Sequence, residues 1–231
     1  MGRRALRKID PAIDLSNHYR ELEQLAPPLD PQSLFARPAP LELEMGSGKG
    51  LFLYGASKVR PEHNFLGVEI AHKYAQFTAS RLARAGRTNA VMIDGDGLRL
   101  FREFLPTACA IAVHVYFPDP WWKKRHRKRR VLNSAFLADV VRVLVPQGRL
   151  HFWTDVEEYY HATLELIQAV PALVGPVEVA EPPSLHDLDY RTHFERRTRK
   201  AGEPVYRSEF IRAATEETPK NEAPAATPAV P

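Results

Sequence analysis

The sequence predicts an α/β fold with a doubly wound, mostly parallel sheet. Between residues 41 and 170, short apolar segments typical of strands alternate with longer segments of helical periodicity. The run ACAIAVHVYF, residues 108–117, is almost continuously apolar, as expected of a strand buried on both faces. Glycines or acidic residues follow the successive strands, and parallel sheets bind their ligands at these carboxyl ends.

The first half of the predicted domain holds three strands, each followed by a helix. The strands are LELEM (41–45), NFLGVEI (64–70) and NAVMID (89–94). The helices are LFLYGASKV (51–59), AHKYAQFTASRLARAG (71–86) and GLRLFREFL (97–105). Gly86 stands where the C-terminal cap of the second helix is expected.

The second half continues the alternation after the buried strand at 108–117. A helix is predicted at 134–148, closed by proline and glycine, then a strand at 149–155 and a helix at 156–170. Segments 176–182, 191–202 and 204–212 read as strand, helix and strand. The predicted domain therefore spans residues 41–212.

Two polar segments flank this domain. Residues 1–40 contain several prolines and are predicted to form an arm with one helical turn near 15–25. Residues 213–231 are rich in alanine and proline and low in large apolar side chains, so a disordered tail is expected.

The composition is that of a globular protein that stays out of membranes. Hydrophobic residues make up 44% of the 231 and charged residues 26%, and neither a membrane span nor a secretory signal is expected. A single cysteine, Cys109, stands in an apolar stretch and is expected to be buried and structural. No cluster has the spacing of metal ligands. We therefore predict a cytoplasmic protein without a metal; the sequence predicts no oligomeric state.

The positive charge is concentrated in three short segments. Residues 1–10, 121–130 and 191–200 carry 16 of the 32 lysines and arginines but only two of the 28 acidic residues. The rest of the chain is net negative, although the whole chain has a charge of +4. Basic patches on an otherwise acidic protein are typical of a localised contact with a polyanion. The arm cations (Arg3, Arg4, Arg7 and Lys8) either clamp RNA or are disordered.

The glycine-rich segment ELEMGSGKG, residues 42–50, predicts a cofactor loop at the end of the first strand. Glycine allows the backbone at Gly46 and Gly48 to approach a ligand closely. Glu69, which ends the second strand, suits the hydroxyl groups of a ribose. This pattern is compatible with two classes of cofactor, a dinucleotide and a methyl donor. The G-x-G-x-G spacing and the preceding Glu44 favour a cationic donor such as S-adenosylmethionine, with Asp96 near the adenine.

The segment PDPWWKKRHRKRR, residues 118–130, follows the buried strand and combines an acid, two tryptophans and seven cations. Prolines on both sides restrict the backbone of Asp119, as expected of a preorganised site. One tryptophan, Trp121 or Trp122, is expected to pack in the core and the other to stack on a base. The cations from Lys123 to Arg130 are expected to contact phosphates.

At these motifs the chain resembles the tRNA (guanine-N7-)-methyltransferases of the bacterial type. The matching segments, between about residues 40 and 211, are LELEMGSGKG, FLGVEI, FPDPWWKKRHRKRR, FWTDVEEY and THFERRTRKAG. The resemblance implies a Rossmann-like class I methyltransferase that uses S-adenosylmethionine. It also implies methylation at N7 of a guanine in the variable loop of tRNA.

The resemblance also implies roles for individual residues. The donor is expected to be bound by Glu44, Gly46, Gly48, Glu69, Asp96 and Asp119. Asp119 is also the expected catalytic residue. The RNA side is expected to comprise Lys123, Asp155, Thr192, His193, Phe194 and Glu195.

Two other functions stay open at this point. An RNA-binding protein could retain the fold without activity, although the intact acidic and glycine positions argue against this. A nicotinamide-dependent oxidoreductase is the second alternative. Separately, His114 lies within the buried strand and is expected to be a hydrogen-bonded core histidine rather than a ligand.

Overall fold

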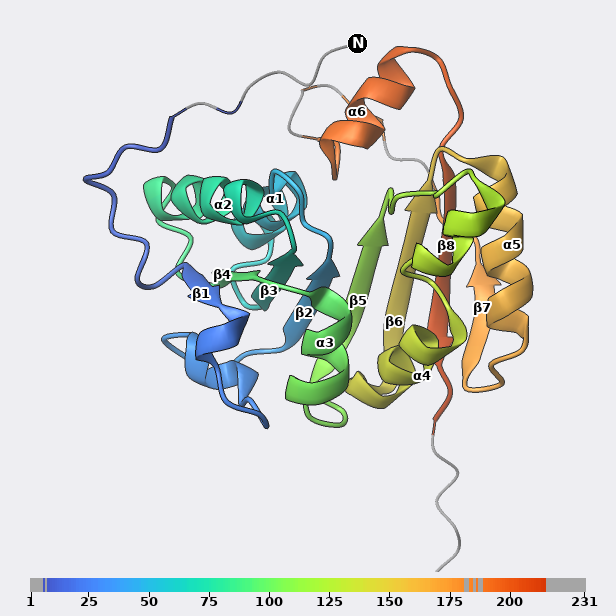
Figure 1. Cartoon of the computed structure of the whole chain (residues 1–231), viewed down its shortest axis with the longest axis horizontal. Coiled ribbons are helices and arrows are strands. Elements are labelled where there is room, and N and C mark those ends of the chain that lie inside the picture. Colours follow the sequence, from blue (N-terminus) through green and yellow to red (C-terminus); the bar gives the residue numbers. More distant parts are fainter. Residues whose placement is uncertain (1–5, 7, 181–182, 185, 187–188, 215–231) are drawn as a thin grey trace, which may run out of the picture.

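The centre of the molecule is a single twisted sheet (Figure 1). The structure, a computed structural model, describes residues 6, 8–180, 183–184, 186 and 189–214. Within these residues eight strands form a sheet in the order β1-β4-β3-β2-β5-β6-β8-β7. Strands β1 to β6 pair in parallel, β8 runs antiparallel to β6, and β7 runs antiparallel to β8. The predicted doubly wound, mostly parallel sheet is therefore confirmed.

Most predicted elements form within a few residues of their expected bounds. The strands are β1 (Tyr19–Glu21), β2 (Leu41–Met45), β3 (Asn64–Glu69), β4 (Ala90–Asp94), β5 (Ala110–Tyr116), β6 (Leu144–Thr154), β7 (Leu173–Val177) and β8 (Tyr206–Arg212). The α-helices are α1 (Leu51–Val59), α2 (His72–Arg84), α3 (Gly97–Arg99), α4 (Ser134–Val143), α5 (Glu157–Gln168) and α6 (His193–Lys200). Shorter helical turns are η1 (Leu22–Gln24), η2 (Pro31–Leu34), η3 (Leu100–Phe104, π-helical) and η4 (Lys124–Arg129).

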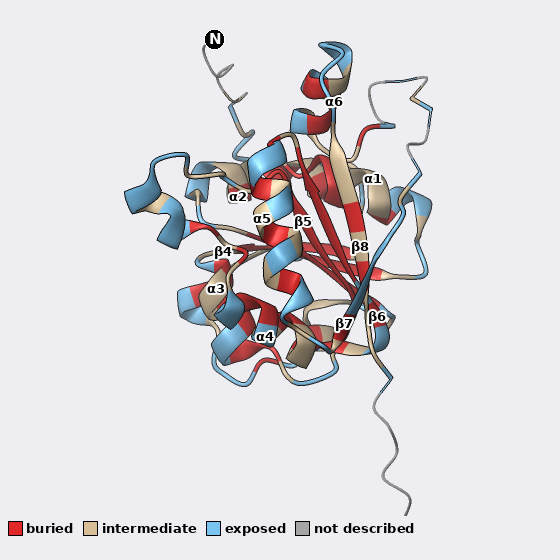
Figure 2. Ribbon diagram, turned by 90° about the vertical axis from the view of Figure 1, so that its right-hand side faces the viewer, coloured by how far each residue is buried: buried red, intermediate tan, exposed pale blue. Residues whose placement is uncertain are grey.

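Helices cover both faces of the sheet, and each face has its own apolar core (Figure 2). On one face, α1 and α2 pack on the sheet through a cluster that includes Phe52 and Leu82. On the other, η3, α4 and α5 pack through a larger cluster that includes Phe101, Phe136 and Ile167. The strands between these layers are buried on both sides, which explains the nearly continuous apolar run in β5.

The topological switch point of the sheet lies between β2 and β5. The chain leaves β2 for β3 and β4 on one side, then crosses to β5 and β6 on the other. Ligands bind outside the carboxyl ends of the strands at such a point. Helix α6 lies across this edge of the sheet, beyond the strand ends (Figure 1).

One boundary, between α4 and β6, differs from its prediction. The helix was expected to reach residue 148 but ends at Val143, and Leu144 already has an extended backbone. Pro146 accounts for this, because proline disfavours the helical conformation of the residue before it. Residues 144–148 instead join β6, whose pairing with β5 is irregular between Ala110 and Ala112.

Strand β7 also differs from its prediction. The strand was expected at 176–182 but spans Leu173–Val177. Its pairing with β8 is irregular between Val174 and Val177, around the proline at position 176. Proline has no backbone N–H to donate, so it interrupts an antiparallel ladder.

Part of the predicted arm is built into the sheet. Strand β1 pairs with β4 and was not predicted; the turn η1 follows it, within the range expected to hold one helical turn. Leu22 is fully buried and packs against Gly95, where an added Cβ would lie 2.5 Å from the Cβ of Leu22. The described residues do not include Arg3, Arg4 and Arg7 of the arm. They also leave out residues 215–231 of the tail that was expected to be disordered. No described helix is long and apolar enough to span a bilayer.

Candidate active site

The glycine-rich segment forms a tight loop between β2 and α1. We call residues 46–50 the donor loop. Gly46, Gly48 and Gly50 have φ angles of 75°, 54° and 64°, a region that favours glycine. A Cβ added at Gly46 or Gly48 would meet nothing within 4 Å, so these positions leave open space beside the backbone. Gly50 is different, because an added Cβ there would lie 2.2 Å from Thr78.

Glu69, at the end of β3, holds the donor loop in place. Its carboxylate accepts a hydrogen bond from the backbone N–H of Gly48 and another from that of Ala71, both at 2.8 Å. Each carboxylate oxygen retains further acceptor capacity. Glu69 can therefore fix the loop and accept from a ribose at the same time.

Glu44, on β2 beneath the donor loop, is a buried acid with an orphaned oxygen. Its exposed fraction is 3%, and its Oε2 atom has no hydrogen-bond partner among the described residues. Burial raises the pKa of Glu44 to about 8, and the negative charge of Glu69 adds to this effect. A cation placed against Oε2 would supply the missing partner. The residues present therefore fit S-adenosylmethionine, which carries an ammonium and a sulfonium group.

Asp96 lies at the same edge of the sheet. It follows β4, and its side chain accepts from the N–H of Leu98 at 2.9 Å, which caps α3. The adjacent Gly97 packs so closely on Met45 that an added Cβ would lie 2.4 Å from the sulfur. This contact brings the exposed Asp96 beside the end of β2.

The segment from Phe117 to Trp121, here called the Pro-Asp-Pro loop, leaves the end of β5 in a strained conformation. Phe117 and Trp121, which bracket the loop, have φ angles of 50° and 46°. Bulky residues rarely adopt this left-handed region, and such strain clusters at functional sites. The Phe117 N–H donates to the carbonyl of Trp153 at 2.7 Å, and Asp119 between the two strained residues is exposed.

Arg130 supports the Pro-Asp-Pro loop from below. It is buried, its Nε–H donates to the carbonyl of Pro120 at 2.7 Å, and its guanidinium lies 4.5 Å from the ring centroid of Tyr159. It also lies 3.4 Å from Glu158, which pairs with Arg127 at 3.0 Å. These two arginines, predicted among the phosphate contacts, are thus bound to the protein itself.

We call residues 123–130 the basic segment. Apart from Arg127 and Arg130, its cationic side chains face outward. Lys123, Lys124 and Lys128 are exposed, and no acid of the described chain lies within ion-pair distance of them. Trp121 is half-buried, with the Arg129 guanidinium 5.1 Å from its ring centroid, whereas Trp122 is 63% exposed. Trp122 is therefore the tryptophan that a partner can reach.

Helix α6 begins at a capping arrangement within the predicted RNA-side block. The Thr192 hydroxyl accepts from the N–H of Glu195 at 3.0 Å, and the Glu195 carboxylate accepts from the N–H of Arg191 at 2.6 Å. Glu195 is only 1% exposed and lies 3.2 Å from Arg199 and 3.6 Å from Arg207. The buried Glu195 thus fixes the first turn of α6, whereas Thr192 at the N-cap is half-buried.

Side chains of α6 contact the loops after several strands. The ring of Phe194 stacks on that of Phe117, with centroids 6.1 Å apart, and remains 47% exposed. The Thr198 hydroxyl donates to Asp155, after β6, at 3.4 Å. Burial lowers the pKa of His193 to about 4, and the positive charges of Arg196, Arg81 and Lys49, the last of which belongs to the donor loop, add to this effect. Helix α6 therefore links the ends of β2, β5 and β6.

The structure thus brings most predicted site residues to one edge of the sheet. Lys123 stands apart, because its side chain is exposed and contacts none of the other predicted site residues within the described chain. No group of three or more His, Cys, Asp or Glu side chains in the described part of the chain is arranged to hold a metal ion. Sequence reasoning missed Tyr116 and Arg191, whose side chains meet at 2.6 Å although they stand 75 residues apart. This contact could not be predicted, because nothing in the sequence near either residue indicates that the two side chains meet in the fold.

Comparison with known proteins agrees with this geometry. The model of a family described as "Putative methyltransferase" matches residues 38–208. A tRNA (guanine-N(7)-)-methyltransferase of Rhodopirellula baltica is 51% identical over 213 residues, which cover 90% of this chain and 79% of that protein. The chain belongs to the tRNA (guanine-N(7)-)-methyltransferase family.

Further members of the tRNA (guanine-N(7)-)-methyltransferase family are more distant. The one from Paracidovorax citrulli is 36% identical over 189 residues, 81% of this chain and 74% of that protein. Among solved structures, a 16S rRNA (adenine(1408)-N(1))-methyltransferase variant of Catenulisporales acidiphilia with SAM is similar in fold. It has a TM-score of 0.53 and 19% identity, and the match covers 77% of this chain and 88% of that one.

Proposed function

We propose that this protein transfers a methyl group from S-adenosylmethionine to N7 of a guanine in tRNA, giving 7-methylguanosine. The observation that carries the proposal is the 51% identity over 90% of the chain to a tRNA (guanine-N(7)-)-methyltransferase. We further propose that the guanine lies in the variable loop, as the motif resemblance implies. With tRNA as the substrate, we also propose that the protein acts in the cytoplasm.

The donor site in this proposal is the edge formed by β2, β3 and β4. When bound, S-adenosylmethionine supplies the methyl group, which passes from its sulfur to N7. Glu44 would face the positive charge of the donor, and Glu69 would accept from the ribose hydroxyls. The open space beside Gly46 and Gly48 lets the loop backbone approach the donor closely. Asp96 would bind at the adenine end.

Asp119 is the proposed catalytic residue. Guanine N7 carries a free lone pair and no proton, so its attack needs no strong general base. Placement and stabilisation of developing charge are the main requirements. The exposed carboxylate of Asp119 can accept from the N1–H or N2–H₂ edge of guanine and stabilise the positive charge that spreads into the methylated ring. The strained loop around Asp119 supports a preorganised role.

The RNA-binding surface in this proposal extends from the basic segment to α6. Lys123 and its exposed lysine neighbours would contact phosphates. Trp122 and Phe194 are exposed aromatic side chains on which a base can stack, a contact worth about 1–3 kcal/mol. Asp155, Thr192 and His193 would contribute to this surface from the end of β6 and the start of α6, and Glu195 would act by holding the start of α6.

Methyl transfer to tRNA tests the proposal directly. Purified protein is incubated with methyl-labelled S-adenosylmethionine and tRNA that lacks 7-methylguanosine, and the digested nucleosides and fragments are separated. We expect label in 7-methylguanosine from a variable-loop fragment. Label in 7-methylguanosine from another region would retain the reaction and reject the variable-loop position.

Two other results would reject the reaction itself. Label in a different nucleoside would retain the donor and fold but remove the proposed guanine role of Asp119. Absence of label, with donor binding intact, would favour an RNA-binding protein without activity.

A further inference from the structure

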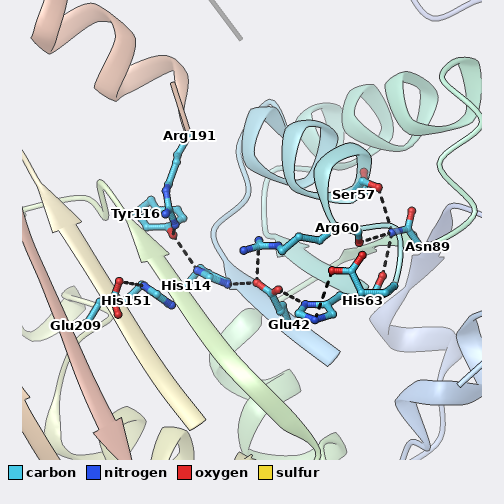
Figure 3. Close-up of polar contacts among 11 residues, drawn as sticks. Glu42, Ser57, Arg60, His63, Asn89, His114, Tyr116, His151, Arg191 and Glu209 are labelled. Carbon is cyan, nitrogen blue, oxygen red and sulfur yellow. Dashed lines mark hydrogen bonds and ion pairs between the residues drawn. The ribbon is translucent and has the colours of Figure 1, made fainter. Parts of the chain in front are cut away.

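A line of buried polar side chains crosses the interior of the sheet (Figure 3). It begins at Glu42 on β2, whose Oε2 lies 2.7 Å from Nε2 of His114 on β5. The other ring nitrogen of His114, Nδ1, lies 2.8 Å from the hydroxyl of Tyr116. The Tyr116 hydroxyl accepts from Nη1 of Arg191 at 2.6 Å. All but Arg191 are buried, and His114 is 1% exposed.

The direction of each hydrogen bond in this line follows from the state of His114. Burial lowers the pKa of His114 to about 3, and its stacked neighbour His151 adds to this effect, so the imidazole is neutral at pH 7. Glu42 is ionised, because bonds from His114 and His63 and the charge of Arg60 outweigh its burial and hold its pKa near 2. His114 therefore donates to Glu42 and accepts from Tyr116, which accepts from Arg191. Every member of the line has a partner.

Arg191 connects this line to α6. It immediately precedes Thr192, the N-cap of the helix, and its own backbone N–H donates to Glu195. Its guanidinium also lies 4.7 Å from the ring centroid of Trp153. In Figure 3 the Arg191 side chain points from the segment leading into the helix toward Tyr116. One residue thus ties the start of α6 to the strands beneath it.

The position of α6 matters because its side chains meet the loops of the candidate site. Phe194 stacks on Phe117 at the entry to the Pro-Asp-Pro loop, and Thr198 bonds Asp155. Among the described residues, the contacts of α6 with the loops after β5 and β6 include this stack and a long hydrogen bond of 3.4 Å. The short bond between Arg191 and Tyr116 is an anchor that reaches the sheet interior, beside the ion pair of Glu195 with Arg207 on β8.

We infer that Tyr116 and Arg191 are positioning residues that hold α6 over the donor and guanine sites through the hydrogen bond between their side chains. Neither residue needs to touch the substrate. The kinetic part of this inference rests on the proposed tRNA methylation, whereas the placement of α6 does not.

Three variants test the inference. Tyr116→Phe removes only the hydroxyl, Arg191→Met removes the donor, and Arg60→Met is a matched control at the opposite end of the line. Arg60 donates to Glu42 at 3.1 Å, from the C-terminal end of α1. Hydrogen exchange by mass spectrometry reads the protection of residues 193–200. Exchange there should accelerate by about threefold to tenfold in Tyr116→Phe and Arg191→Met, the effect of one lost hydrogen bond, and stay unchanged in Arg60→Met.

Kinetics and a double variant complete the test. The kcat/KM for tRNA should fall by about threefold to tenfold in the two α6-side variants but not in Arg60→Met at a similar melting temperature. The double variant Tyr116→Phe/Arg191→Met should lose less than the sum of the two single variants, because both single variants remove the same hydrogen bond. Unchanged exchange in α6, or an equal effect of Arg60→Met, would overturn the inference. Inactive wild-type protein with the expected exchange pattern would reject the proposed function alone.

Discussion

At the scale of single residues, the proposed donor site contains a buried carboxyl group that retains its proton at neutral pH. The folded pKa of Glu44 is about 8, against 4.5 for an ordinary glutamate, because the group is buried without a cation. Between these two pH values the folded protein binds more protons than the unfolded chain. The contribution of Glu44 to the free energy of unfolding is therefore full below about pH 4.5 and is lost as the pH rises toward 8.

Replacing Glu44 with glutamine should stabilise the protein when no donor is bound. The gain in unfolding free energy should grow as the pH rises from 5 to 8, on the order of 1–3 kcal/mol at pH 8, because glutamine has no proton to lose. Urea denaturation at several pH values measures it. The same variant should bind S-adenosylhomocysteine more weakly, since its ammonium group loses an anionic partner. A variant less stable than wild type at pH 8 would contradict this account.

Asp119 should behave in the opposite way, as a residue needed for turnover but not for stability. Asp119→Asn retains the size of the side chain and removes its negative charge. We expect kcat for methyl transfer to fall by about 100-fold or more, as for loss of a preorganised electrostatic group. The melting temperature should stay nearly unchanged, because the side chain is exposed.

The control for this variant is Glu62→Gln, an exposed acid at the opposite end of the strands, before β3. It should retain wild-type turnover. Near-normal kcat in Asp119→Asn would remove the catalytic role of that residue.

At the scale of elements, the basic segment divides into supporting and free cations. Arg127 and Arg130 pair with Glu158, and Arg130 also binds the Pro-Asp-Pro loop. The exposed lysines have no such role within the described chain. Sequence alone assigned all of these cations to phosphate contacts, because a run of like charges does not reveal which side chains turn inward.

This division predicts how the segment responds to charge removal. Lys123→Gln/Lys128→Gln should weaken tRNA binding and reduce the slope of log affinity against log salt by about 2, one for each lost phosphate contact. Lys58→Gln/Arg84→Gln removes the same charge from exposed positions near the C-terminal ends of α1 and α2 and should leave that slope unchanged. Filter binding at several salt concentrations gives both slopes. Equal slopes for the two double variants would place the RNA elsewhere.

At the scale of the whole molecule, donor binding should stabilise the entire domain. Its proposed contacts join β2, β3 and β4 with the loop after β5, so unfolding any of them would release the ligand. S-adenosylhomocysteine at about 100 times its Kd should raise the melting temperature by roughly 5–10 °C. NAD at the same concentration should not. Stabilisation by NAD instead would indicate an oxidoreductase.

Sequence patterns were sufficient for the alternating core of the fold. The strands β2 to β5 are largely buried, so the apolar runs of β3 to β5 are easily recognised in the sequence, and Gly86 ends α2 as expected at the C′ position. His114, expected to be a hydrogen-bonded core histidine, is confirmed as one. The acids and glycines at the strand ends pointed to one edge because parallel strands end together.

Features that depend on distant contacts could not be predicted in this way. β1 is only three residues long and forms because it pairs with β4, some 70 residues later, as shown by Tyr19 opposite Met92. The inward roles of Arg130 and Glu195 also depend on tertiary partners. Nothing in the local sequence distinguishes a buried arginine from an exposed one in the same basic run.

The place of β8 in the sheet has a consequence for protein synthesis. This strand is the last of the described chain to leave the ribosome, yet it lies between β6 and β7. Until residues 206–212 emerge, β6 is an open edge that carries apolar side chains such as Phe152 and Trp153. Open apolar edges pair with other chains. Chains cut short before residue 206 should therefore aggregate, because the sheet is completed only after β8 has been synthesised.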